Sequence, residues 1–241
     1  MTNLCIDLGN SSTKTGIFRN DELVETLVYE QLSAYELEKI ISKHNIEACI
    51  LSSVTDIRPD IEDFLTEKIR CFIRLEYQTK VPVENRYLTP QTLGKDRLAA
   101  VVGAITLRPN ADLLVIDAGT AITYDFVDRN GVYHGGNIAP GIEMRLKALH
   151  NYTSKLPLVD LADTEILFGN DTRSAILAGV VNGILFEIEG YINTLKHKIP
   201  ELSVFLTGGS TFYIDSKLKS AIFAEKNLVL IGLNRILQFN V

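Results

Sequence analysis

Two short stretches of the chain each place an aspartate at the end of an apolar run, followed by a small, hydroxylated turn. Leu4–Phe18 reads LCIDLGNSSTKTGIF, and Leu113–Phe126 reads LLVIDAGTAITYDF. The glycine in each turn lets the chain close without a Cβ atom, and backbone N–H groups beside small residues can face an anion. A carboxylate at the strand end, Asp7 or Asp117, can hold a cation near that anion. Taken alone, each stretch is equally typical of an ordinary hairpin with a polar tip.

The recurrence of the pattern favours the anion-binding interpretation. Asp7 and Asp117 lie about 110 residues apart, close to half the length of the chain, and self-similarity on that scale indicates a duplicated domain. Each half would then contribute one such turn.

A third stretch, Tyr87–Arg97, reads YLTPQTLGKDR and precedes an apolar helix predicted over Leu98–Leu107. Asp96 can cap that helix, with Arg97 as a solvated neighbour. The same residues also suit binding of a small polar acid, because arginine can fork onto a carboxylate, tyrosine can bond a hydroxyl and aspartate can accept a proton.

Composition narrows the function classes. The 241 residues are 46% hydrophobic and 22% charged, with a net charge of −6, which is typical of a globular protein and argues against a nucleic-acid partner. No run of 18 unbroken apolar residues and no basic-then-apolar leader is present, so we expect a cytoplasmic protein without a membrane partner. Three scattered cysteines in apolar runs indicate reduced core thiols, and the four histidines form no ligand-spaced pair.

In the first half, the pattern predicts the order expected of one ribonuclease H-like domain: three strands, helix, strand, helix, strand. A capping box of Ser33 and Glu36 marks the first helix. After the hairpin at Asp7, the predicted elements are a strand Leu23–Tyr29, a helix Ala34–Lys43, a strand Ala48–Val54, a helix Pro59–Ile69 and a strand Cys71–Leu75.

The second half repeats the beginning of this order. Its predicted elements are strands Leu113–Asp117, Ala121–Val127 and Val132–Gly135, a helix Ile142–His150, an irregular stretch Thr153–Glu165, a helix from Thr172 to about Lys198, a strand Ser203–Leu206 and a helix Leu233–Phe239. The long helix carries a wide apolar stripe with Gly179 and Gly183, which suits either core packing or a dimer contact. Glycines at 135–136 and 141 would admit either a nucleotide or a neighbouring strand.

In its ordered set of motifs, the chain resembles the type III pantothenate kinase family from the first strand to the last helix. The motifs are Asp7-x-Gly9-Asn10, Tyr87…Gly94-x-Asp96-Arg97, Asp117-x-Gly119-Thr120, Gly135-Gly136-Asn-Ile-Ala-Pro140-Gly141, Gly169-Asn170-Asp171-Thr172 and Thr207-Gly208-Gly209. Ser11 departs from the family, which more often has threonine there, but serine keeps the hydroxyl group. The chain is also slightly short for the family.

The resemblance implies the fold of the superfamily of acetate and sugar kinases, heat-shock chaperones and actin. This is an α/β fold of two tandem ribonuclease H-like domains, here 1–111 and 112–241, each a mixed β-sheet flanked by helices. ATP would bind in the interdomain cleft, and its γ-phosphoryl group would be transferred to pantothenate, the first step of coenzyme A biosynthesis.

The resemblance also assigns roles to residues. Asp96 would be the general base, Mg²⁺ would accompany ATP, and Asp117 would bind a required monovalent cation, K⁺ or NH₄⁺. The family is homodimeric, and Thr172 would contact substrate across the dimer interface. ATP would be bound by Asp7, Leu8, Gly9, Asn10, Ser11, Ser12, Thr13, Lys14 and Thr120, and pantothenate by Tyr87, Gly94, Lys95, Asp96, Arg97 and Thr172.

Three alternatives remain at this stage. A kinase or phosphatase of the same superfamily would act on a sugar, acetate or polyphosphate. A non-catalytic accessory transcription regulator of the same fold would bind DNA, which the net charge of −6 disfavours. An actin-like filament protein would need extra subdomains, for which the chain is short.

Overall fold

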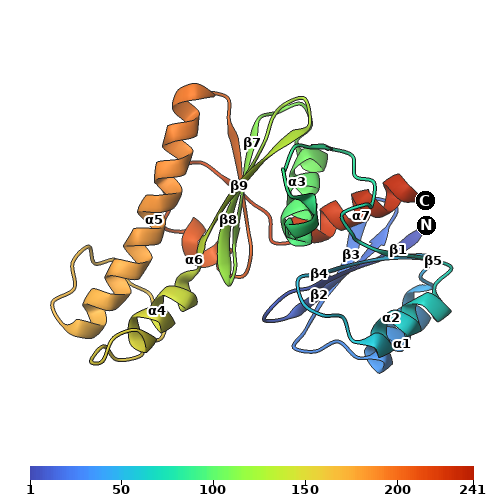
Figure 1. Cartoon of the computed structure of the whole chain (residues 1–241), viewed down its shortest axis with the longest axis horizontal. Helices are drawn as coiled ribbons and strands as arrows, with labels where there is room; N and C mark the ends of the chain where they lie inside the picture. Colours follow the sequence, from blue (N-terminus) through green and yellow to red (C-terminus); the bar gives the residue numbers. More distant parts are fainter. The chain divides into compact units, whose positions relative to one another are not determined.

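The computed structural model describes all residues, Met1–Val241, and shows an α/β protein with two mixed sheets flanked by helices (Figure 1). The strands are β1 (Thr2–Leu8), β2 (Thr13–Arg19), β3 (Glu22–Tyr29), β4 (Ala48–Ser53), β5 (Cys71–Arg74), β6 (Glu84–Asn85), β7 (Leu113–Ala118), β8 (Ala121–Val127), β9 (Val132–Pro140), β10 (Ser203–Thr207) and β11 (Phe223–Ala224). The helices are α1 (Ala34–His44), α2 (Pro59–Lys68), the 3₁₀ helix η1 (Pro90–Thr92), α3 (Lys95–Leu107), α4 (Ile142–Asn151), α5 (Thr172–Lys198), α6 (Thr211–Asp215) and α7 (Leu228–Asn240).

The chain forms two compact units. Unit 1 comprises Met1–Ala111, Phe126–Gly135 and Asn227–Val241, and unit 2 comprises Asp112–Asp125 and Gly136–Lys226. The contacts therefore do not follow a single cut after residue 111, because the C-terminal helix α7 packs with the first part of the chain.

The two sheets share one strand order, which confirms the predicted duplication of a ribonuclease H-like fold. The first sheet runs β3-β2-β1-β4-β5, with β1–β2 and β2–β3 antiparallel and β1–β4 and β4–β5 parallel. The second runs β9-β8-β7-β10-β11, with the short strand β6 added beside β9. If β7 is counted as the first strand of the second half, this order is again third, second, first, fourth, fifth. Hydrophobic periodicity does not predict β6, η1, α6 or β11, which are each at most five residues long.

Unit 1 has helices on both faces of its five-stranded sheet, with α1 and α2 on one side and α3 and α7 on the other (Figure 1). Alternation along β1 explains this arrangement. Leu4 and Ile6 are buried with α1 and α2, whereas Cys5 is buried with α3 and α7. Burial raises the pKa of the Cys5 thiol well above its usual range, so this cysteine is a neutral core residue.

Helices α3 and α7 approach each other closely within unit 1. A Cβ atom on Gly103 would meet the backbone of Leu228, and one on Gly232 would meet the backbone of Ala99. This contact also explains why α7 begins at Leu228 rather than at the predicted Leu233. Gly232 disfavours a helix by local propensity, but here it is the residue that permits tertiary packing.

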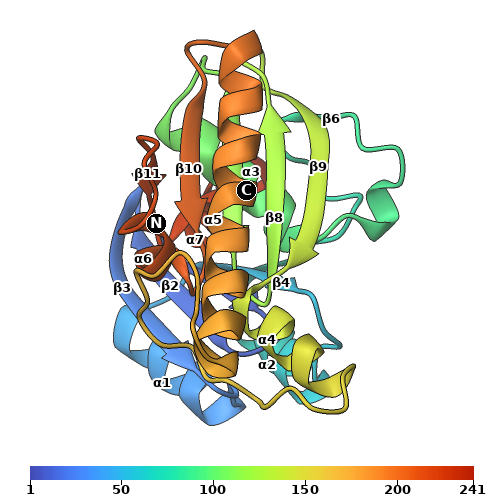
Figure 2. The same cartoon turned by 90° about the vertical axis from the view of Figure 1, so that its left-hand side faces the viewer.

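Unit 2 is built around the long helix α5, which crosses the face of its sheet in front of β8 and β10 (Figure 2). The predicted helix boundaries of 172 and 198 are confirmed, and a capping box of Asp171 and Ser174 begins the helix. Tyr124 on β8 stacks on Tyr191 of α5 at a ring-centroid distance of 4.2 Å.

By length and hydropathy alone, α5 is the one helix that could cross a membrane. Core helices pass the same test, and α5 buries seven residues in the fold: Ile176, Ala178, Val180, Val181, Ile184, Ile188 and Ile192. The composition of this helix is therefore weak evidence for a membrane span.

Candidate active site

The Asp7 stretch forms the predicted hairpin between β1 and β2. Leu8 pairs with Thr13, and the backbone N–H of Gly9 donates to the carbonyl of Ser12 at 3.1 Å, which closes the turn. Asp7 lies directly opposite Lys14 in the antiparallel register. The loop is therefore held at its base, while Asn10 at its tip is exposed to solvent.

The Asp117 stretch forms the equivalent turn in unit 2, where β7 is joined to β8 through Gly119 and Thr120. The backbone N–H of Gly119 donates to the carbonyl of Ala121 at 3.0 Å, and that of Gly141 donates to the carbonyl of Thr120 at 3.0 Å. Thr120 is exposed at the end of the turn.

A second glycine segment meets Asp117 from the next strand. Thr207 pairs with Asp117 in the parallel register of β10 and β7. Gly208 follows with a φ of +98° and packs so closely that a Cβ atom there would collide with the Asp117 carboxylate and the backbone of Ala118. Three motifs that are far apart in sequence, at 117–120, 140–141 and 207–209, thus converge at one place in unit 2.

Two of the glycines in the predicted motifs pack against the backbone of neighbouring segments. Gly136 lies against the backbone of Tyr124 on the neighbouring strand, and Gly141 lies against the backbone of Gly119 and Thr120. The sequence left open whether these glycines admit a nucleotide or a neighbouring strand. In the structure, both glycines lie against neighbouring backbone.

The Tyr87–Arg97 stretch forms a compact cluster in unit 1. The Arg97 guanidinium lies 5.6 Å from the centroid of the Tyr87 ring, and only 5% of Arg97 is exposed. Tyr87 is itself stacked on Tyr133 of β9, with 6.3 Å between ring centroids and an interplanar angle of 10°. Tyr133 is buried and has no motif in the sequence that would single it out.

Asp96 is not the N-cap that the sequence predicts. Helix α3 begins at Lys95 with Gly94 at the N-cap, which places Asp96 inside the first turn. Oδ1 of Asp96 accepts a hydrogen bond from the backbone N–H of Arg97 at 2.8 Å, and it lies over Gly94, where a Cβ atom would be 2.6 Å away. The helix terminus still stabilises the carboxylate, since the first-turn N–H groups carry partial positive charge.

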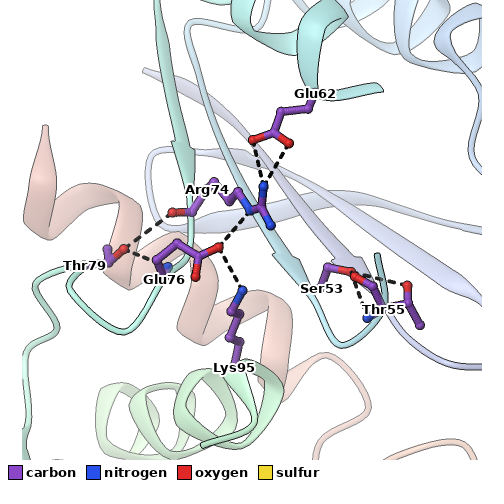
Figure 3. A network of polar contacts seen from close by, with 7 residues as sticks. All are labelled: Ser53, Thr55, Glu62, Arg74, Glu76, Thr79 and Lys95. Carbon is purple, nitrogen blue, oxygen red and sulfur yellow. Dashed lines mark hydrogen bonds and ion pairs between the residues drawn. The ribbon is translucent and has the colours of Figure 1, made fainter. Parts of the chain in front are cut away.

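The ammonium of Lys95 is engaged within unit 1 rather than extended into solvent (Figure 3). Its Nζ donates to Oε1 of Glu76 at 3.0 Å. Glu76 follows β5, 19 positions earlier in the chain, and no local pattern in the sequence marks it as a partner.

Thr172 is the first residue of α5 and lines a groove of about 800 Å³ between α4 and α5. Arg145 borders the same groove, and its Nη2 lies 2.7 Å from Oε2 of Glu187. Tyr124 donates to the other oxygen of Glu187 at 2.8 Å, and burial together with this hydrogen bond raises the pKa of Tyr124.

No group of three or more histidine, cysteine, aspartate or glutamate side chains could hold a metal ion. Mg²⁺ commonly binds through one or two carboxylates, substrate phosphates and water, so a single carboxylate such as Asp7 fits an ion that arrives with ATP. Asp117 offers a carboxylate beside the backbone of Ala118, an all-oxygen donor set that suits a hard monovalent cation.

Comparison with known proteins connects this geometry to a family. The family profile for type III pantothenate kinase matches residues 3–194. The type III pantothenate kinase of Phocaeicola vulgatus is 50% identical over 238 residues, with 99% of this chain and 98% of the relative covered. The chain belongs to the type III pantothenate kinase family. The type III pantothenate kinase of Christiangramia forsetii is 42% identical over 240 residues, with 99% and 98% covered. The chain is accordingly a pantothenate kinase.

Solved structures support the fold of this pantothenate kinase. A Campylobacter jejuni protein assigned to the Baf family of transcriptional activators is 24% identical with a TM-score of 0.61, and 98% of each chain is covered. A glucokinase of the ROK family from Streptomyces griseus, solved with glucose and AMPPNP, is 10% identical with a TM-score of 0.54, and 99% of each chain is covered. At these identities the similarity concerns the fold alone.

Proposed function

We propose that this pantothenate kinase transfers the γ-phosphoryl group of ATP to the primary hydroxyl of pantothenate with Asp96 as general base. The observation that carries the proposal is the cluster of Tyr87, Asp96 and Arg97 in unit 1. It combines a carboxylate that can accept a proton, a guanidinium that can fork onto a carboxylate and a phenol that can bond a hydroxyl.

Within this proposal, Asp96 orients the acceptor hydroxyl and accepts its proton. The carboxylate is suited to this because the backbone N–H of Arg97 holds one of its oxygens in place. A carboxylate suffices as the base, since phosphoryl transfer depends mainly on positioning and charge neutralisation. Tyr87, Gly94, Arg97 and the backbone of Lys95 hold pantothenate, with the buried guanidinium of Arg97 directed to its carboxylate.

The turns at Asp7 and Asp117 are proposed to bind ATP and its cations. The turn between β1 and β2, residues 8–14, would bind the phosphates, and Thr120 would donate its hydroxyl to them. Asp7 would hold Mg²⁺ that arrives with ATP, and Asp117 would bind K⁺ or NH₄⁺. When bound, these cations supply neutralisation of the phosphate charge.

The active form is proposed to be a homodimer formed through α4 and α5. Large apolar side chains are exposed in this part of unit 2, including Tyr152 (88%), Phe168 (85%) and Phe186 (63%). Extended apolar surface of this kind marks protein interfaces. Gly179 and Gly183 face open space on α5, which would admit the helix of a second copy, and Thr172 lies on the same groove.

A coupled assay tests the proposal directly. Purified protein is incubated with ATP, Mg²⁺, K⁺ and pantothenate, and ADP release is followed while each component is omitted in turn. We expect turnover only with all four. Turnover without a monovalent cation would remove that role from Asp117, and turnover with sugars or acetate but not pantothenate would contradict the proposed acceptor.

A further inference from the structure

A chain of four alternating charges ties the first turn of α3 to the edge of the first sheet (Figure 3). Nζ of Lys95 lies 3.0 Å from Oε1 of Glu76, and Nε of Arg74 lies 2.8 Å from the same oxygen. Arg74 then donates from Nη1 to both carboxylate oxygens of Glu62, at 2.9 and 3.1 Å. The chain thus links α2, β5 and the loop after β5 to the residue that precedes Asp96.

Glu76 is fixed at its backbone as well as at its carboxylate. Its N–H donates to the hydroxyl of Thr79 at 2.9 Å, which holds the loop after β5. The interaction of Arg74 with Glu62 is the main cause of the raised pKa of Arg74, so the guanidinium is charged at every physiological pH. A network of several charges holds its geometry better than an isolated surface pair does.

Lys95 is an unusual residue for its position. A cation in the first turn of a helix is opposed by the positive end of the helix dipole. Glu76 compensates this charge and also restrains a side chain with four rotatable bonds, of which 25% is exposed. The pair therefore fixes the ammonium on the sheet side of α3.

We propose that Glu76 is a positioning residue for the phosphoryl acceptor, acting through Lys95 on the first turn of α3. Lys95 contributes to the acceptor site by anchoring this turn, and its ammonium binds Glu76 rather than pantothenate. The inference rests on the proposed role of Asp96, whose carboxylate is bonded to the backbone of the same turn.

The proposal predicts that loss of Glu76 and loss of Lys95 lower kcat/KM for pantothenate to the same extent. Displacement of a catalytic group by about 1 Å can cost 100-fold in rate, so a loosened turn is expected to lower kcat/KM for pantothenate on the order of ten-fold. KM for ATP is expected to stay within about two-fold, because other loops are proposed to bind the phosphates.

The experiment is a double-mutant cycle on the purified full-length chain, with Glu76→Ala, Lys95→Met and the combined variant. We expect similar losses of kcat/KM for pantothenate in all three, because residues acting as a unit are non-additive. Lys95→Arg, which keeps the cation, is expected to restore most of the activity. Glu25→Gln is the matched control, since Glu25 pairs with Lys43 at 2.8 Å between β3 and α1 in the same unit.

Several results would overturn the inference. Lys95→Met losing much more activity than Glu76→Ala would indicate direct contact between the ammonium and pantothenate. Additive losses would show that Glu76 and Lys95 act independently of each other. Equal rises of KM for both substrates, or the same kinetic loss in Glu25→Gln, would indicate a merely structural role. If the wild-type protein itself shows no pantothenate-dependent turnover, the proposed function fails instead, so the two failures are distinguishable.

Discussion

At the scale of single residues, the cluster of Tyr87, Asp96 and Arg97 is held in place by the protein alone. Arg97 is buried against the ring of Tyr87, and that ring is stacked on Tyr133, so neither group must be ordered when a substrate binds. Asp96 is fixed by a backbone hydrogen bond in its own helical turn. Groups held in this way lose little entropy on binding, which is the main requirement for precise positioning.

Asp96→Asn tests the proposed base at this scale. The amide keeps the size of the side chain but cannot accept the hydroxyl proton, so kcat is expected to fall by about 10²–10⁴. ATP affinity, measured by calorimetry, is expected to remain nearly unchanged. Near-normal turnover in this variant would remove Asp96 from the role of base.

At the scale of elements, the crossing of α3 and α7 fixes the helix that carries Asp96. Gly103 and Gly232 allow the two backbones to come closer than side chains would permit. Since α3 also packs on β4, with Val102 and Ile50 buried in one cluster, α7 and the sheet hold it from two directions. Asp96 is thereby placed on a helix that is held by two packing partners.

Gly232→Ala is expected to destabilise the protein through this crossing. Its Cβ would enter the backbone of Ala99, and overpacking of this kind costs about 1–3 kcal/mol. Denaturant unfolding followed by circular dichroism measures the change in the free energy of unfolding. Gly190→Ala, at a position on α5 with open space around it, is the control and is expected to be neutral or stabilising. Equal stability of both variants would show that the crossing is not tight.

At the scale of the whole molecule, the exposed apolar surface of unit 2 is where the proposed homodimer would form. Phe186→Glu places a charge on the exposed face of α5 and is expected to convert a dimer to a monomer, since burial of an unpaired charge is costly. Light scattering after size-exclusion chromatography measures the mass. Val28→Glu, at an exposed position on β3, is the control. A wild-type protein that is monomeric and fully active would contradict the dimer.

The chain's local pattern was enough to predict most elements and their order. Strand alternation and the capping box of Ser33 and Glu36 depend on neighbouring residues, so they can be predicted without tertiary contacts. Where local propensity gave a wrong helix boundary, a tertiary contact explains the difference. The glycine that shortens the predicted C-terminal helix is the residue that lets α7 pack on α3.

From the sequence alone, one can determine the duplicated α/β fold, the two Asp-Gly turns and the Tyr87–Arg97 motif, because residue type and short spacing encode them. Only the tertiary structure decides which distant residues meet. It brings Gly208 onto Asp117 and Tyr133 onto Tyr87, and it pairs Glu76 with Lys95. Such partners are set by strand register and helix packing, and these depend on contacts across the whole chain rather than on any local pattern.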